Sequence, residues 1–472
     1  MNLFFFSIFI RIVNYKFSIY KKIIILFFII LIADYKNYST ENNLELDNNY
    51  LNVQFDLNLT FPNKLEHKIK IAVYYTSIKN GGIERVNTLF LNYLNKAIIF
   101  KIYLLTHNKQ ENEYPIPIDI KRIIINPRKK NNLIKILNRE KIDILIYHFY
   151  NDKEMEALNN LKYTKTIFYN HSCFFIWIYA KMYYYFRTIY NAYKNSKYII
   201  SLIPFENNYL FKKWGINSVL MNNFITYNYH YVIPSDLSSK LILMIGRASD
   251  RLKRFDLGLK AMHYILKEIP EAKLKIISSV YLAEFLLDEI KQLKLEKSVE
   301  FIGYISNPEI YFKNASLHLF PSISESFGLV LSETKIFGIP NILLGLDYVS
   351  LAKGGTIIIY DDNSLFIARE SLKILKNEKY RKKLGREARK SMKRFNNELL
   401  LKKWIKLILS IYNGEKYYDH LRKQETNISI NNDVNRLENQ IKLLNKRLNF
   451  KKNITIENLE NFTFMKNLEY YF

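Results

Sequence analysis

The sequence contains a single cysteine, Cys173, among its 472 residues. A lone cysteine excludes an intramolecular disulfide framework and is typical of a reducing compartment. Zinc-finger spacing, an RNP motif and a basic zipper are also missing from the sequence. Hydrophobic residues make up 49% of the chain, which excludes a disordered polymer and allows large cores. The length favours about three domains.

Acidic residues are fewer than basic ones, which gives a formal net charge of +26. The lysines are spread along the whole chain beside many Ile, Asn, Tyr and Phe residues, so the charge reflects composition and not one binding patch. We therefore expect no nucleic-acid partner. A basic chain is still drawn to anionic surfaces, and a membrane surface is the better candidate.

The N-terminus carries two apolar runs that are short for a membrane span. The second run, residues 23–33, has 11 residues, whereas a spanning helix needs about 20. Counted from Phe17, a tilted span is possible if Lys21 and Lys22 reach the interface. We interpret the segment as a membrane anchor that spans or lies on the bilayer. The alternatives are an uncleaved hydrophobic leader and a signal peptide, although no A-x-A-like cleavage site follows.

Alternating strand-like and helical runs predict an α/β protein. One set begins with KIKIAVYY at residue 68, and a second begins with KLILMIG at residue 240, after a weakly patterned stretch over 222–239. Two such sets predict two tandem Rossmann-like domains with parallel sheets that face a cleft. Ligands bind in such folds beyond the carboxyl ends of the strands.

The segment 430–450 has a different pattern, with apolar residues spaced three and four apart. The pattern extends over fewer than three heptads, so it favours a short coiled coil or a single amphipathic helix, and it suggests a homo-oligomer. The apolar positions are Val434, Leu437, Ile441, Leu444 and Leu448.

The stretch FPSISESFGLVLSETKIFGIPNILLG, residues 320–345, carries the most informative motif. A strand ends near Pro321, and a helix is expected from Phe327–Gly328 to Phe337, with Gly338 and Pro340 as stop signals.

Two carboxylates flank the start of this helix, because Glu325 precedes it and Glu333 lies inside it. A helix N-terminus suits phosphate, Gly328 allows close approach of a ligand, and carboxylates accept hydrogen bonds from hydroxyl groups. A diphosphate between two polyols, which is a nucleotide-sugar, fits both demands. Taken alone, Glu325 is also compatible with a simple helix-dipole role and Glu333 with a solvent-facing position.

Further candidates follow three other strands. Arg247 and Lys253, in MIGRASDRLKRFD, are placed to neutralise a diphosphate, or they belong to a solvated basic loop. Gly81 and Gly82, in NGGIER, allow close backbone approach or form an ordinary turn; the G-x-G-x-x-G motif is missing. His171 follows a strand in FYNHSC, where it is either functional or incidental.

On these motifs the chain resembles the family 4 glycosyltransferases, which retain anomeric configuration and have the GT-B fold. The resemblance rests on GR with Lys253, on VEFIGYISNPEIYFKNASLHLFPS, and above all on ESFGLVLSE followed by IFGIP, which is similar to the family's E-x7-E motif. It covers about residues 68–395, and GGIERV with His171 resembles the acceptor-domain part.

The resemblance implies a role for each matched residue. Arg247 and Lys253 would hold the diphosphate, Glu325 the hydroxyls of the donor sugar, and Glu333 the ribose hydroxyls. The distal phosphate and sugar would be cradled by the backbone of Phe327, Gly328, Leu329 and Val330. Gly82, beside Gly81, would approach the diphosphate. His171 would lie near the reaction centre. Glu325 as a covalent nucleophile remains an alternative to its orienting role.

The sequence pattern and the resemblance together predict a domain plan. The expected parts are an N-terminal hydrophobic segment and linker over 1–67, an acceptor-side Rossmann-like domain over 68–228, a nucleotide-sugar-binding domain over 229–395, a crossing helix over 396–415, and a short coiled coil or amphipathic helix over 430–450. We expect the protein on the cytoplasmic side of a membrane, peripheral or anchored by its N-terminus.

The expected activity is transfer of a sugar from a nucleotide diphosphate-sugar to a hydroxyl acceptor, with retention, in surface glycan or glycolipid synthesis. No cofactor or metal is expected, because no D-x-D motif follows a strand; Asp361–Asp362 reads as a turn. The aromatic stretch SCFFIWIYAKMYYYF departs from the family's pattern and leaves the acceptor, a glycan or a lipid-linked molecule, unassigned. The alternatives are a GT-B-fold nucleotide-sugar epimerase or phosphorylase and a catalytically degenerate scaffold.

Overall fold

The fold is described from a computed structural model. It describes residues 67–79, 81–129, 131–149, 152–173, 190–278, 284–305 and 307–414. Three predicted features lie outside the described residues: the N-terminal anchor, the coiled coil or amphipathic helix over 430–450, and the aromatic stretch after Cys173. The described residues belong to one compact unit, Thr60–Phe472.

The first half of the described chain forms a parallel sheet in the order β3-β2-β1-β4-β5-β6-β7. Its strands are β1 (Ile69–Tyr74), β2 (Phe100–Thr106), β3 (Lys121–Ile124), β4 (Ile144–Tyr147), β5 (Lys165–Tyr169), β6 (Tyr198–Ser201) and β7 (Val219–Leu220). Its helices are α2 (Gly82–Leu94), α3 (Asn132–Glu140), α4 (Asp152–Asn159) and α7 (Pro204–Trp214).

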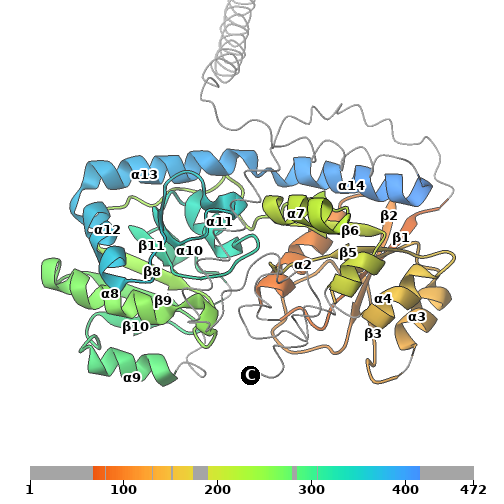
Figure 1. Ribbon diagram of the computed structural model, residues 1–472, viewed down its shortest axis with the longest axis horizontal. Coiled ribbons are helices and arrows are strands. Elements are labelled where there is room, and N and C mark those ends of the chain that lie inside the picture. The colour runs from red at the N-terminus through yellow and green to blue at the C-terminus, as the bar shows by residue number, and fades with distance from the viewer. Residues whose placement is uncertain are drawn as a thin grey trace, which may run out of the picture. The chain divides into compact units, whose positions relative to one another are not determined.

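The second half forms another parallel sheet in the order β10-β9-β8-β11-β12-β13. Its strands are β8 (Leu241–Ile245), β9 (Lys273–Ile277), β10 (Val299–Phe301), β11 (Leu317–Phe320), β12 (Asn341–Leu344) and β13 (Thr356–Ile359). Its helices are α8 (Phe255–Glu268), α9 (Glu284–Gln292), α10 (Glu309–Phe312), α11 (Leu329–Ile336), α12 (Ser364–Lys376) and α13 (Glu378–Ser391), with α14 (Asn397–Asn413) after them (Figure 1).

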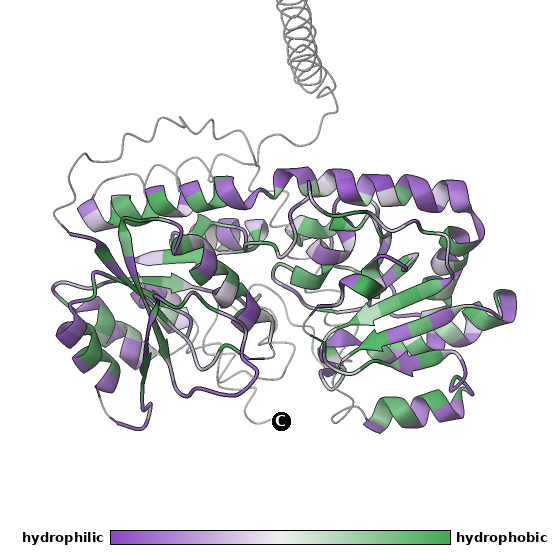
Figure 2. Ribbon diagram, turned by 180° about the vertical axis from the view of Figure 1, so that it is seen from behind, coloured by the Kyte–Doolittle hydropathy of each residue, from purple (hydrophilic) through white to green (hydrophobic). Residues whose placement is uncertain are grey.

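The central strands of both sheets are mostly apolar and are buried along their length. Every residue of β4 and β12 is buried, as expected for parallel strands covered on both faces. Figure 2 shows strands that are largely hydrophobic in both halves, whereas the helices carry many hydrophilic residues. The sequence prediction of two parallel α/β sheets is therefore confirmed.

Each sheet reverses its direction of growth at one point, between β1 and β4 in the first and between β8 and β11 in the second. Loops beyond the carboxyl ends of the strands at such a switch point leave room for a ligand. The predicted glycines follow β1, Arg247 and Lys253 follow β8, and Glu325 follows β11. The topology therefore collects these candidates at the two switch points.

Helix α14 packs against the first half of the chain. Trp404 is fully buried, and its ring lies 4.7 Å from that of Phe90 on α2. Lys165 Nζ donates hydrogen bonds to the carbonyl oxygens of Ile411 and Tyr412, at 2.7 and 2.8 Å. A cation at these last carbonyls complements the negative end of the helix dipole.

Helix α13 lies directly against the end of α11 (Figure 1). Gly338 follows α11 in the left-handed conformation, with φ of 71°, as its place after the helix predicted. Gly385 of α13 faces the Gly338 carbonyl so closely that a β-carbon on Gly385 would collide with it and with Leu237. The two glycines therefore allow α13 to fix the position of α11.

We predict that Gly385→Ala destabilises the protein, although alanine favours helices over glycine by about 1 kcal/mol. The added methyl group meets backbone that cannot turn away, and overpacking of this kind costs about 1–3 kcal/mol. Gly258→Ala in α8 is the matched control, because its methyl group meets only the flexible side chain of Met244. Urea denaturation should show a lower midpoint for Gly385→Ala than for Gly258→Ala; equal midpoints would contradict the packing argument.

Candidate functional site

Helix α11 begins directly beyond the carboxyl end of β11. Gly328 precedes it with φ of 78°, a conformation that favours glycine. Backbone N–H groups in the first turn of a helix lack partners within the helix, and no acidic residue occupies this first turn. Leu329 and Val330 are half-buried, while Phe327 is buried and packs against Phe395 with ring centroids 5.9 Å apart. The start of α11 is therefore suited to an anionic group.

Lys253 and Glu325 form an ion pair beside this helix start. Lys253 ends the short 3-10 turn Arg251–Lys253 that follows β8, and its Nζ lies 2.5 Å from Oε1 of Glu325. The two side chains are only 20% and 13% exposed. The backbone N–H of Ile323 donates to the carbonyl of Leu252, at 3.0 Å, and joins the two loops. The structure thus brings these two predicted residues together.

Arg247 lies apart from that pair. Its side chain is 74% exposed and contacts Asp250 at 3.6 Å. Burial raises the pKa values of Tyr75 and Glu84 in the first half of the chain, and the charge of Arg247 lowers both. Arg247 therefore lies within electrostatic reach of the residues that follow β1.

Glu333 is a buried carboxylate with two partners on one oxygen. Its Oε1 lies 3.0 Å from Nη1 of Arg85 and accepts a hydrogen bond from Oγ1 of Thr226 at 2.7 Å. Its Oε2 is buried and has no hydrogen-bond partner. Burial raises the pKa of Glu333, while the charge of Arg85 and the hydrogen bond from Thr226 lower it.

Two tyrosines interact electrostatically with this carboxylate. Tyr114 and Tyr227 both have raised pKa values, mainly through burial, and the negative charge of Glu333 contributes to each. Tyr304, after β10, donates a hydrogen bond from its hydroxyl to that of Tyr114 at 3.2 Å. Polar groups that can turn to a bound hydroxyl or base therefore lie near Glu333.

His171 lies directly after β5 and contacts the Glu325 loop through its backbone. Its carbonyl oxygen accepts a hydrogen bond from Oγ of Ser326 at 2.5 Å. The side chain turns to His148, with Nε2 of His171 2.9 Å from Nδ1 of His148, and it packs on Tyr169 with ring centroids 4.2 Å apart. Burial lowers the pKa of His171 well below its usual value, and His148 lowers it further. Burial also lowers the pKa of His148 to about 3.

The predicted glycine pair lies at the start of α2. Gly81 is the residue before the helix, and a β-carbon there would collide with the side chain of Glu84. No atom lies within 4 Å of the place where a β-carbon of Gly82 would be. Gly82 therefore leaves its backbone open to approach, although neither residue has a positive φ.

Several residues of the site escaped the sequence analysis. Arg85 lies within the GGIERV motif, one helical turn after Gly82, and this spacing was the signal that could have identified it. His148 directly follows β4, and this strand-end position was the same signal that identified His171. Thr226 and Tyr114 carried no signal, because they reach the site from separate loops.

Other features of the described residues lie away from this arrangement. A solvent-open hollow of about 960 Å³ lies between α8 and α12, and it includes none of the predicted site residues. Among the described residues, no group of three or more His, Cys, Asp or Glu side chains is arranged to hold a metal ion.

Comparisons with known proteins show which proteins this chain is similar to. Residues 228–391 match the family Glycosyl transferases group 1. The chain is 28% identical over 205 residues to the poly(glycerol-phosphate) alpha-glucosyltransferase of Bacillus subtilis. The aligned residues cover 42% of this chain but only 30% of that protein. The chain thus spans less than a third of this relative's length.

A second relative is matched over nearly its whole length. It is the N-acetylgalactosamine-N,N′-diacetylbacillosaminyl-diphospho-undecaprenol 4-alpha-N-acetylgalactosaminyltransferase of Campylobacter jejuni, 25% identical over 379 residues, which is 72% of this chain and 99% of that protein. Among solved structures, Anabaena Alr3699/HepE in complex with UDP and glucose has a TM-score of 0.60 at 13% identity, covering 72% of this chain and 100% of that chain. The chain therefore has the GT-B fold of glycosyltransferases, and its residues 228–391 match the family Glycosyl transferases group 1.

Proposed function

We propose that this protein transfers a sugar from a nucleoside diphosphate-sugar to a hydroxyl acceptor, with retention of anomeric configuration. The observation that carries the proposal is the unpartnered Oε2 of the buried Glu333, on the helix whose start lies beside the Lys253–Glu325 pair. A buried oxygen without a partner is rare in native proteins, because it loses its hydrogen bonds to water. A ribose hydroxyl is a donor of the right kind for it.

The remaining groups fit the other parts of such a donor. The N–H groups at the start of α11 and the ammonium of Lys253 are donors for the diphosphate, on which negative charge grows as the glycosidic bond breaks. Glu325, which pairs with Lys253 in this structure, accepts hydrogen bonds from sugar hydroxyls. Arg247, with its exposed side chain, is free to turn to the diphosphate from the other side. The approach of Gly82 to the diphosphate and the place of His171 near the reacting sugar belong to the same proposal.

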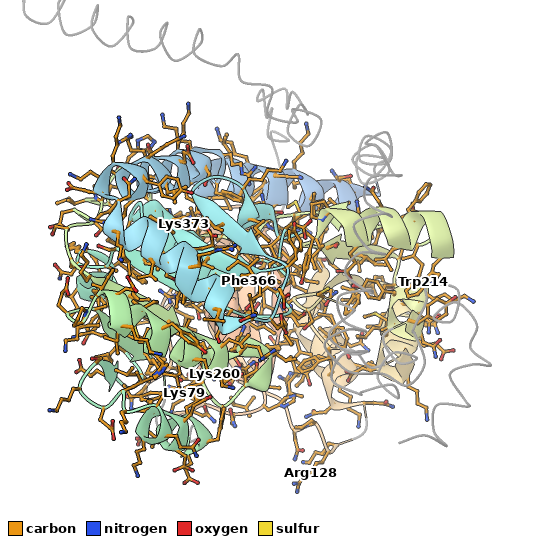
Figure 3. The ribbon with its side chains drawn as sticks, turned by 60° about the vertical axis from the view of Figure 1, so that its left-hand side comes forward. Lys79, Arg128, Trp214, Lys260, Phe366 and Lys373 are labelled. Atoms are coloured by element: carbon orange, nitrogen blue, oxygen red, sulfur yellow. The ribbon has the colours of Figure 1, made fainter. Side chains whose placement is uncertain are left out.

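We propose a glycan or lipid-linked molecule as the acceptor and the cytoplasmic side of a membrane as the place of action. The name of the Campylobacter jejuni relative includes a diphospho-undecaprenol. The basic composition also supports the proposal: Figure 3 shows Arg128 projecting from the ribbon, and this residue is exposed. Within the described part of the chain, no helix is both long and apolar enough to cross a bilayer.

Lys253→Ala should lower the turnover of the nucleotide-sugar by about 10²–10³-fold, because it removes a fixed charge that meets the leaving diphosphate. Arg247→Ala should act in the same direction, with a smaller loss because its side chain is largely exposed. Lys260→Ala is the control, because Lys260 lies on α8 of the same half (Figure 3). Its Nζ lies 3.2 Å from Oε1 of Glu289. Near-normal turnover in both test variants, with circular dichroism unchanged, would refute these roles.

Retention predicts that the product glycoside has the anomeric configuration of the donor sugar. Proton NMR of the first product formed from an α-linked nucleotide-sugar should show the small coupling constant of an α-anomer. A β-linked product contradicts retention, and a new nucleotide-sugar formed without an acceptor identifies an epimerase instead.

Deletion of residues 1–40 should reduce the fraction of protein that sediments with vesicles containing anionic lipid, because it removes the apolar segment and leaves only surface charge. High salt should then release the remainder, since exposed charges are screened within about 10 Å at 0.1 M salt. If the truncated and full-length proteins partition equally, the N-terminus is not an anchor.

A further inference from the structure

The buried ion pair between Arg85 and Glu333 joins the two halves of the chain. Arg85 lies on α2 of the first half, and Glu333 lies on α11 of the second. The side chain of Glu333 is 1% exposed and that of Arg85 is 20% exposed. The pair is therefore largely shielded from water. In such surroundings the attraction between opposite charges is stronger than at the protein surface.

The two oxygens of the Glu333 carboxylate differ in their contacts, and Arg85 contributes to this difference. Oε1 is held by Nη1 of Arg85 at 3.0 Å and by Thr226 at 2.7 Å. With Oε1 held in this way, rotation of the carboxylate would break both contacts. Oε2 consequently stays in one position, buried and without a partner.

Arg85 is also the cation that balances the charge of Glu333. The titratable groups Arg85, Tyr114 and Tyr227 interact with this carboxylate. The two phenols are neutral near pH 7, because their pKa values are raised above the usual value. Burial alone favours the protonated form of Glu333, and Arg85 opposes it.

We propose that Arg85 is a positioning residue of the donor site, whose ion pair with Glu333 fixes Oε2 as the acceptor for ribose hydroxyls. The inference rests on the proposed function. Its consequence is that Arg85, on the first half of the chain, contributes to nucleotide binding without itself touching the ribose, so the ribose site is complete only while α2 lies against α11.

The test is binding of nucleoside diphosphates to the full chain by calorimetry. The probe is the tightest binder among uridine, guanosine, adenosine and cytidine diphosphate, together with its 2′,3′-dideoxy form, which lacks the ribose hydroxyls. The variants are Arg85→Met, Arg85→Lys, Glu333→Gln and the double variant. Arg139→Met is the matched control, because Arg139 pairs with Glu140 on α3 of the same half, with Nη2 3.1 Å from Oε1.

We expect Arg85→Met to weaken binding of the normal nucleotide by about tenfold or more, the range for hydrogen bonds that involve a charged group. Without Arg85 the pKa of Glu333 rises further, and a protonated carboxyl is a weaker acceptor. The loss should therefore be larger at low pH than at high pH. Arg85→Lys should restore part of the affinity, and Arg139→Met should bind as the wild type does.

The dideoxy probe and the double variant separate positioning from a general structural effect. The dideoxy nucleotide should bind equally to wild type and Arg85→Met, and Arg85→Met should add nothing to the loss in Glu333→Gln. Equal weakening of both probes at every pH overturns the inference, as does normal binding by Arg85→Met alongside weak binding by Glu333→Gln. Normal binding by Glu333→Gln contradicts the proposed function itself.

Discussion

The burial of α11 is the constraint on which the rest of the site depends. This helix lies inside the second half of the chain, and even its charged residues Glu333 and Lys335 are buried. A buried charge is unstable unless it is paired or hydrogen-bonded. Lys335 donates from Nζ to the carbonyl oxygens of Leu351 and Lys353, both at 2.6 Å. Glu333 instead finds its cation on α2, in the other half of the chain.

This requirement explains why the candidate site includes both halves. The N-terminal end of α11 presents backbone donors, and the adjacent loops add Lys253 and Glu325. The first half supplies Arg85 to the same helix, and the carbonyl of His171 accepts a hydrogen bond from Ser326 in the loop before it. Electrostatic and hydrogen-bonding needs of one buried helix thus bring together residues that are far apart in sequence. The glycine contact between α11 and α13 fixes the helix from its other end.

Much of the fold was predictable because its signals are local. Apolar runs gave the parallel strands, and Gly338 with Pro340 gave the end of α11. Parallel strands place their carboxyl ends on one edge, so Lys253 and Glu325 could be expected near one another, and the structure pairs them. The strand bounds were less predictable: IDIKRIII forms a strand only over Lys121–Ile124, since pairing with β2 begins there.

The sequence by itself determined the two α/β sheets, the glycines and the carboxylates at the ends of their strands, because periodicity and chain punctuation act over a few residues. Only the tertiary structure decided which side chains meet: Arg85 with Glu333, His148 with His171, and Arg247 near Glu84. These partners come from different loops or different halves of the chain. Their meeting depends on strand order and helix packing, which bring distant residues together without leaving a local pattern in the sequence.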